Sequence, residues 1–276
     1  MIRKAKQILL KKKSYIFWMV FLLILTMISL LAPILPISPD KIDIAHMSQG
    51  PSISHIFGTD EVGRDYFIRV IYGGRVSLFV GFLSMTTAII IGVTVGVIAG
   101  YFGGVIDTIL MRMLDALSAI PWLVLVIVLS AFLTPGLTTI IIVIGGFSWM
   151  NIARLVRAET LTNKTRDFVI YAKFIGQRHV NVIFKHILPI IMPTIITAAG
   201  ANIANAIMTE SALSFLGLGI QPPNASWGSL LQSAQGRLED LPYMAIIPGL
   251  FIILTVLSFN SIGNFLSDFS RPEGIQ

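Results

Sequence analysis

Cysteine is absent from this sequence, and charged residues make up only 12% of it. The lack of cysteine excludes a disulfide framework and any metal site built from thiolates. The scarcity of charge argues against a soluble globular domain, in which about a quarter of the residues are charged. Apolar residues instead make up 55% of the chain. This composition indicates an integral membrane protein.

Catalytic and nucleotide-binding motifs are also absent. The sequence contains no HExxH, no GxSxG and no phosphate-cradling GxxxxGK[ST] loop. Its histidines, His46, His55, His179 and His186, fall on different segments. We interpret the last two, which lie on a basic segment, as solvated or facing a partner. We therefore expect no catalytic residue, no metal site and no cofactor bound by this chain itself.

Six long apolar runs are predicted to be transmembrane helices, which need roughly 20 mostly apolar residues. They cover residues 15–35, 76–101, 117–133, 137–150, 187–208 and 241–267. The first run could instead be a secretory signal, but its 21 residues exceed the apolar core of about 7–15 residues that signals have. We therefore predict an all-α, polytopic membrane protein with six transmembrane helices.

Lysine and arginine are distributed unevenly between the two sides that these spans define. With the N-terminus inside, 15 of the 20 basic residues fall on inner segments, namely residues 1–14, Arg112, the loop 153–189 and the tail 268–276. Cytoplasmic loops near the membrane retain such residues. We therefore expect the N-terminus, this loop and the C-terminus to be cytoplasmic. The same bias explains the net charge of +6 without nucleic acid.

Residues 36–75 form an outer segment that is too short for an independent domain. Thr59 or Asp60 is expected to cap a helix that lies in the membrane interface and steers the chain into the second span. A second outer stretch, residues 214–227, is rich in glycine and proline and is predicted to form turns.

Glycine recurs at every fourth position in the second span, at Gly92, Gly96 and Gly100. Small residues at this spacing allow another helix to approach closely. This face is therefore predicted to pack against a second helix, whose identity the spacing leaves open.

The start of the third span carries two opposite charges and a proline. Arg112 and Asp115 are three residues apart, so they are placed to pair on one helix face. Pro121 is expected to kink the helix.

Three polar residues, Asn202, Asn205 and Thr209, share one face of the fifth span. Polar side chains at membrane depth either bond neighbouring helices or line a water-filled path. We therefore take these three as candidates for lining a pore, with helix packing as the alternative. Glu210 follows them and is expected at the outer membrane interface, because the span is nearly complete there.

A basic amphipathic segment, residues 165–189, lies between the fourth and fifth spans. Its apolar residues recur at helical spacing up to Ile175, Gly176 interrupts the pattern, and a second short register ends at Pro189. The segment is predicted to form a helix, a turn at the glycine and a second helix on the membrane surface. A protein that only spans lipid does not need such a segment.

Three motifs give the sequence a specific resemblance. GTDEVGRD (58–65) precedes the second span, SFLGLGIQPP with WGSLL (214–231) follows the fifth, and the loop before it carries Gly176 and then HILP (186–189). In this order the motifs resemble the C-type permease subunit of the dipeptide, oligopeptide and nickel family of ABC importers. The resemblance extends from about residue 15 to residue 272.

The resemblance implies the type I ABC importer permease fold in a bacterial cell membrane, with residues 76–267 as the five-helix core. It also implies a pore shared with a B-type permease, two cytoplasmic subunits that bind and hydrolyse ATP, and an extracytoplasmic substrate-binding protein. The chain itself would then not be an enzyme. An ion-coupled secondary transporter is the alternative, although the spans hold very few of the ionisable residues that proton relays need.

The family's permeases carry a cytoplasmic coupling loop, usually with Glu-Ala-Ala, a glycine four residues later and an Ile-x-Leu-Pro ending. The ATPase-coupling residues that the resemblance implies here are Asp167, Phe168, Tyr171, Ala172, Gly176, Ile187, Leu188 and Pro189. The family's acidic residue is replaced by Ile170. Apolar docking of Phe168 and Tyr171 into an ATPase groove is therefore expected in place of a salt bridge.

Peptide and nickel importers share these motifs, so the resemblance leaves the substrate open between di- or oligopeptides and nickel. No histidine of the chain falls at pore depth. We therefore expect nickel, if it is carried, to pass as a chelate that resembles a small peptide.

Overall fold

The structure is a computed structural model that describes residue 8 and residues 12–34 and 38–270. Most of the predicted cytoplasmic ends, residues 1–14 and 268–276, lies outside the described residues. Within the described ranges, five helices are long and apolar enough to cross a membrane, and a bent pair of helices makes a sixth span if it is counted as one. The predicted all-α membrane fold is confirmed.

The long helices are α2 (Lys13–Leu31), α3 (Tyr66–Phe102), α6 (Leu137–Asn163), α9 (Leu188–Phe215) and α11 (Tyr243–Ser270). The bent pair consists of α4 (Gly104–Ser118) and α5 (Trp122–Phe132). Short α-helices are α7 (Asp167–Phe174), α8 (His179–Val182) and α10 (Trp227–Ala234). The remaining elements are the 3-10 turns η1 (Ala32–Ile34), η2 (Ile44–His46) and η4 (Gln235–Arg237) and one π-helical turn, η3 (Ile183–Ile187).

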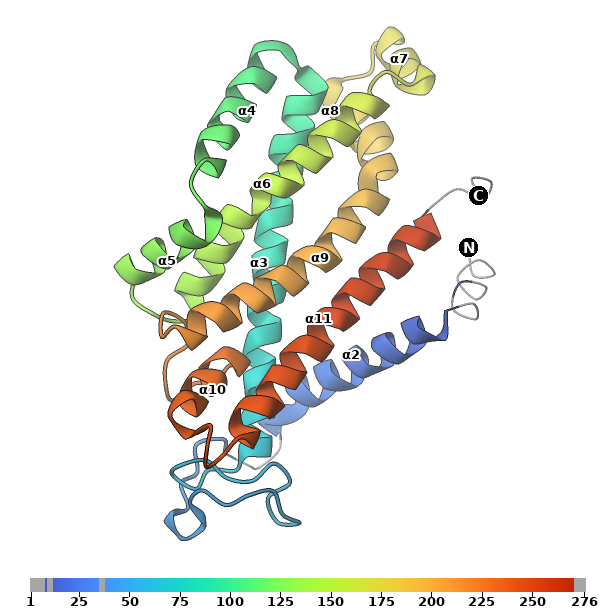
Figure 1. Ribbon diagram of the computed structural model, residues 1–276. Coiled ribbons are helices and arrows are strands. Elements are labelled where there is room, and N and C mark those ends of the chain that lie inside the picture. The colour runs from blue at the N-terminus through green and yellow to red at the C-terminus, as the bar shows by residue number, and fades with distance from the viewer. Residues whose placement is uncertain (1–7, 9–11, 35–37, 271–276) are drawn as a thin grey trace.

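Helix α3 runs through almost the whole length of the molecule, with the α4 and α5 pair to one side and α2 and α11 to the other (Figure 1). Its glycine face packs against α6. A Cβ atom on Gly96 would lie 2.6 Å from the Ala153 carbonyl oxygen, and one on Gly100 would lie 2.7 Å from Thr160 Cβ. Only glycine leaves room for this approach. The predicted packing face is confirmed, and its partner is α6.

The predicted third span, residues 117–133, is wrong in outline. Helix α4 ends at Ser118, α5 begins at Trp122, and the two axes differ by 76°. Pro121 caps α5, and because its ring cannot continue the preceding helix, a sharp break replaces the predicted kink. Helix α5 has 11 residues. Its length of roughly 16 Å is about half the thickness of a hydrocarbon core.

The predicted pairing of Arg112 with Asp115 does not form among the described ion pairs. Asp115 Oδ1 instead lies 3.1 Å from Nη2 of Arg154 on α6. Arg157 of α6 also binds α4, with its Nη2 atom 2.7 Å from Asp107 Oδ2. Helices α4 and α6 lie next to each other only in the folded chain, so local spacing could not predict these partners.

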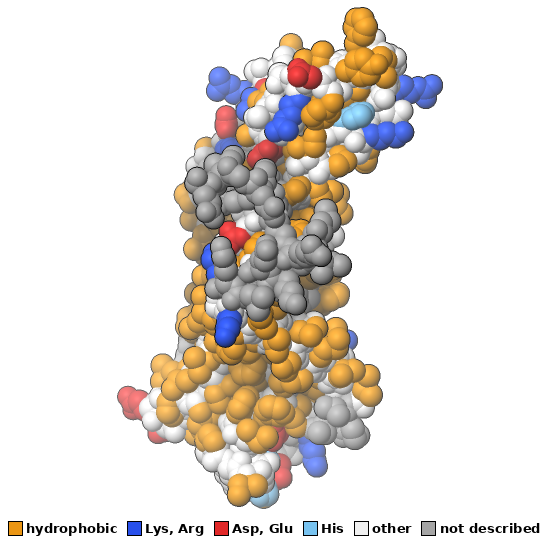
Figure 2. Space-filling view, turned by 90° about the vertical axis from the view of Figure 1, so that its right-hand side faces the viewer, with side chains coloured by type: hydrophobic (Ala, Val, Ile, Leu, Met, Phe, Trp, Pro, Cys, Tyr) orange, Lys and Arg blue, Asp and Glu red, His pale blue; other side chains and the backbone are white. Residues whose placement is uncertain are grey.

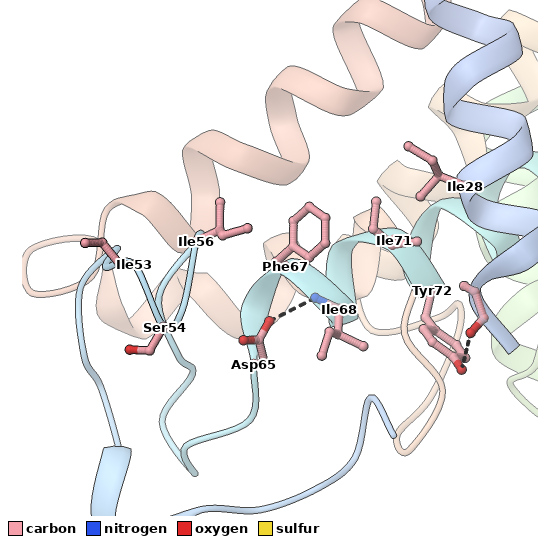
Figure 3. A pocket seen from close by; sticks show the side chains of 10 residues that line it. Ile28, Ile53, Ser54, Ile56, Asp65, Phe67, Ile68, Ile71 and Tyr72 are labelled. Carbon is pink, nitrogen blue, oxygen red and sulfur yellow. Dashed lines mark hydrogen bonds between the residues drawn. The ribbon is translucent and has the colours of Figure 1, made fainter. Parts of the chain in front are cut away.

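Helix α3 begins at Tyr66 and continues into the second span. The prediction of a separate interface helix, capped by Thr59 or Asp60, is therefore wrong. Asp65 is the capping residue, and its Oδ1 atom accepts a backbone N–H of the first turn at 3.1 Å (Figure 3). Tyr66 is fully buried, and its hydroxyl donates to the carbonyl of Met244 on α11 at 2.6 Å. Packing against α11 therefore extends the helix beyond its apolar run.

The fourth and fifth spans belong to helices that are longer than the apolar runs. Helix α6 continues past Met150 to Asn163, and α9 continues past Met208 to Phe215. Glu210 therefore lies within α9, where it is fully buried. Other helices therefore enclose this part of α9, and the expected position of Glu210 at the outer membrane interface stays a prediction.

Candidate functional site

The segment 165–189 forms one end of the molecule, where α7 lies apart from the long helices (Figure 1). Helix α7 has Asp167 in its first turn and Lys173 in its last, so both charges complement the helix dipole. Lysine and arginine side chains gather at this end on the face shown in Figure 2. The predicted order of helix, turn and helix is confirmed.

Gly176 ends α7 in the left-handed region, with φ of +79°. Its N–H donates to the Lys173 carbonyl at 3.0 Å, and the N–H of Gln177 donates to the Ala172 carbonyl at 3.1 Å. This pair of hydrogen bonds is the Schellman cap, for which glycine is preferred. No heavy atom lies within 4 Å of the position that a Cβ would take. Backbone conformation, and not lack of space, therefore requires the glycine.

One face of this segment is buried and the other is exposed. Val169, Ala172 and Ile187 are at most 2% exposed and belong to one apolar cluster with Leu114 of α4. The exposed apolar side chains, named here the α7 apolar surface, are Phe168, Ile170, Tyr171, Phe174, Ile175, Val180 and Phe184. An exposed apolar surface of this kind is typical of a contact with another protein or with lipid.

The structure divides the eight predicted coupling residues into two groups. The exposed residues are Asp167, Phe168, Tyr171, Gly176 and Pro189, whereas Ala172 and Ile187 are buried and Leu188 is half-buried. The exposed group is accessible to a partner. The buried group holds α7 and the start of α9 against the rest of the chain.

Tyr101 of α3 supports this segment, although the sequence analysis did not select it. Its hydroxyl lies 2.9 Å from His179 Nδ1, and Lys173 Nζ lies 4.6 Å from the centre of its ring. The second contact has the geometry of a cation–π interaction. Tyr101 therefore connects α3 to the helices on both sides of the turn. No local pattern signals this role, because the partners lie far along the sequence.

A cleft of about 530 Å³ lies between α5, α6 and α9. Its polar lining consists of Ser118, Ser148, Asn151, Arg154, Asn202, Asn205 and Thr209. The structure thus brings the three pore candidates to one cleft and adds Asn151 and Arg154, which the sequence analysis did not select. Asn202 Oδ1 is buried and has no hydrogen-bond partner among the described residues.

Arg154 is the one charged residue among those that line this cleft in the described part of the chain. It also lines a neighbouring cavity of about 480 Å³, together with Arg112 and Arg157. The two cavities share Arg154 in their lining, and Asp115 also lines the second one. The described residues contain no group of three or more side chains that could hold a metal ion.

Glu210 stabilises the end of the molecule opposite α7. Its side chain is fully buried, with the Ser77 hydroxyl 2.9 Å from Oε2 and the Ser214 hydroxyl 2.8 Å from Oε1. Trp227, the first residue of α10, is also fully buried, and its indole N–H donates to the Val70 carbonyl at 3.0 Å. Sequence analysis predicted turns in this region but missed α10 and the carboxylate that lies beneath it.

Comparison with known proteins places this architecture among transport proteins. Residues 92–272 match the family model described as the binding-protein-dependent transport system inner membrane component. The dipeptide transport system permease protein DppC of Alkalihalophilus pseudofirmus is 38% identical, over 98% of this chain and 90% of that protein. The oligopeptide transport system permease protein OppC of Haemophilus influenzae is 36% identical, over 98% and 88%. The glutathione transport system permease protein GsiD of Pectobacterium atrosepticum is 38% identical, over 84% and 77%.

Two solved structures share the fold. An inward-facing structure of the MetNI methionine ABC transporter covers 72% of this chain and 97% of its own, with a TM-score of 0.58 and 16% identity. An amino acid ABC transporter with histidines covers 73% and 94%, with a TM-score of 0.57 and 17% identity. At these identities the similarity establishes the architecture.

Proposed function

Since this chain belongs to the family of binding-protein-dependent transport system inner membrane components, we propose that its α5–α6–α9 cleft is one wall of a peptide pathway. The chain is a permease subunit of an ABC importer. The partners that we propose are a B-type permease, two ATP-binding subunits and an extracytoplasmic binding protein. In this assembly the partner subunits bind ATP, and the chain needs neither a cofactor nor catalytic residues of its own.

The lining of the cleft is the observation that carries this proposal. The amides of Asn151, Asn202 and Asn205 supply both donors and acceptors, which is what peptide groups require. Arg154, whose Nη2 atom is paired with Asp115 at 3.1 Å, keeps further guanidinium donors that can bind a carboxylate of the solute. Trp122 offers apolar surface for side chains of the solute. Such a wall suits a short peptide that passes with a free carboxyl terminus.

A bare nickel ion fits this wall poorly. Imidazole is a suitable nickel ligand, but no histidine is among the described residues that line the cleft. The relatives described above are named for dipeptide, oligopeptide and glutathione transport. We therefore propose peptides as the substrate class, with chelated nickel as the competing substrate to test.

The α7 apolar surface is the part of the chain that we propose to bind an ATP-binding subunit. Phe174 is 88% exposed and Tyr171 is 66% exposed, although each has a large apolar ring. Ile170 stands where the family usually has an acid, and it belongs to the same surface. Docking by apolar contact in the helix-in-groove manner therefore replaces a salt bridge. The basic side chains around α7 support a cytoplasmic position for this end.

Uptake by proteoliposomes tests the pathway. The full-length chain, reconstituted with its partner subunits and binding protein, should import a radiolabelled dipeptide in the presence of ATP. The double substitution Asn202→Leu and Asn205→Leu should reduce this uptake severalfold while the subunits still copurify, because it removes polar groups from the cleft. Import of nickel with a chelator but not of dipeptide would instead reverse the proposed substrate class.

The matched control is Thr94→Val, since Thr94 is an exposed polar residue of α3 that does not line the cleft. It should import the dipeptide at the wild-type rate. Loss of subunit assembly in the double variant would favour the helix-packing alternative. Wild-type uptake in the double variant would exclude these residues from the pathway.

A further inference from the structure

A separate cleft of about 400 Å³ lies between α2, α3, α9 and α11. Most of its lining is apolar and comes from Leu30, Leu78, Phe79, Phe82, Ile203 and Phe259. Arg75 is the one charged residue that lines it, and its side chain is exposed. Within the described part of the chain, the Arg75 side chain makes no hydrogen bond and no ion pair. An unpaired arginine thus stands beside an apolar cleft.

The position of Arg75 along α3 places it at the level of the lipid headgroups. It directly precedes the charge-free run 76–101, which has 26 residues. A helix of that length extends about 39 Å, which exceeds a hydrocarbon core of about 30 Å. Phe82 lies two helical turns further along α3, on the same cleft. The cleft therefore has a charged side chain at the level of the lipid headgroups and an apolar lining at the depth of the acyl chains.

A hydroxyl group lies near the polar part of this lining. Ser29 of α2 is 1% exposed and lines the cleft, and its Oγ atom has no hydrogen-bond partner among the described residues. Thr26 lines the cleft one turn earlier on the same helix. Thr26 and Arg75 therefore give the cleft hydrogen-bond donors on two helices, whereas the Ser29 hydroxyl is buried beneath the cleft wall.

We propose that this cleft binds one phospholipid with a negatively charged headgroup. The Arg75 guanidinium binds the phosphate through paired hydrogen bonds, which match the planar donors of arginine to phosphate oxygens. One acyl chain lies against Phe79, Phe82 and Phe259. A partner helix in this place would need an acid at the same level to satisfy Arg75, whereas a bilayer supplies phosphate there by its construction.

This inference concerns the contact of the chain with the bilayer and does not depend on the substrate. Native mass spectrometry of the full-length chain, purified with its partner subunits and stripped of lipid, tests it with phosphatidylglycerol as the probe. The wild-type complex should bind one phosphatidylglycerol more tightly than phosphatidylcholine. Arg75→Gln should weaken that binding roughly tenfold, as expected for loss of charge-assisted hydrogen bonds. Arg75→Lys should weaken the binding less than Arg75→Gln does, because the charge remains while the paired hydrogen bonds are lost.

Arg237→Gln is the matched control, since Arg237 is an exposed arginine that does not line the cleft, and it should bind the lipid as the wild type does. Thr26→Trp should also weaken binding, because the added ring fills the space of an acyl chain. Glycerol 3-phosphate should not displace the lipid, because it has no acyl chain. Wild-type phosphatidylglycerol binding by Arg75→Gln would overturn the proposal. Loss of a partner subunit from that variant would also overturn it and would assign the cleft to a protein contact.

Discussion

The hydroxyl of Ser77 on α3 donates a hydrogen bond of 2.9 Å to Oε2 of Glu210 on α9 and accepts one of 3.2 Å from the backbone N–H of Trp227. One serine therefore connects a buried carboxylate to the first residue of α10. All three residues are fully buried. This node holds three helices together at the end of the molecule opposite α7.

Removal of the Glu210 side chain should destabilise the protein. Glu210→Ala leaves the hydroxyls of Ser77 and Ser214 without their acceptor, at a cost of about 1–3 kcal/mol for each buried group. Glu210→Gln should be milder, because its amide oxygen still accepts a hydrogen bond. Size-exclusion chromatography after heating in detergent measures the difference. Glu239→Ala, which changes an exposed acid, is the control and should melt as the wild type does. An equal melting temperature for Glu210→Ala would contradict the structural role of the node.

Substitution of Gly176 should impair transport through backbone strain alone. Valine at φ of +79° costs on the order of 1–2 kcal/mol and redirects the chain toward α8, whereas asparagine tolerates this region better. Open space around the Cβ position rules out a clash as the cause. Gly176→Val should therefore lower both dipeptide uptake and binding-protein-stimulated ATP hydrolysis more than Gly176→Asn does.

Gly236→Val is the matched control for this series. Gly236 also has open space around its Cβ position but lacks a positive φ, so valine there should leave uptake unchanged. Copurification of the partner subunits should be the same for all three variants. Wild-type coupling in both Gly176 variants would show that the left-handed turn is dispensable.

A charge within the α7 apolar surface should weaken binding of the ATP-binding subunits. Phe174 is 88% exposed, so Phe174→Asp disturbs no packing within the chain, but it places a carboxylate in an apolar contact. The amount of ATP-binding subunit that copurifies should fall severalfold. Ile53→Asp, at a fully exposed apolar residue in the loop before α3, is the control and should keep the subunits bound. Normal copurification of Phe174→Asp would place the contact elsewhere.

Cysteine labelling tests the orientation. Because the chain has no native cysteine, single substitutions can be read without background. Ser54 and Thr165 are exposed and lie in loops on either side of the predicted membrane. Ser54→Cys should react with an impermeant thiol reagent in intact cells, and Thr165→Cys only after permeabilisation. The reverse pattern would place α7 outside and remove it from contact with cytoplasmic ATP-binding subunits.

Sequence alone determined the features that depend only on neighbouring residues along the chain or on the surrounding lipid and water. Lipid cannot hydrogen-bond the backbone, so long apolar runs must become helices. Five of the six predicted runs lie largely within single helices, whereas the run 117–133 is broken before Trp122. Gly92, Gly96 and Gly100 were recognisable as a packing face because their spacing matches one side of a helix. Gly176 was recognisable as a turn because it interrupts one helical register and only glycine adopts positive φ freely.

Tertiary structure decided which side chains meet across helices. Asp115 pairs with Arg154 because the fold brings α6 next to α4, although Arg112 lies three residues away in the sequence. Glu210 is buried because α3 and α10 cover a position that would reach the interface on a lone helix. The cleft beside Asn202 depends in the same way on the break at Pro121, which turns α5 away from α4. Hydropathy and spacing act along one helix, whereas each of these contacts depends on where a second helix lies.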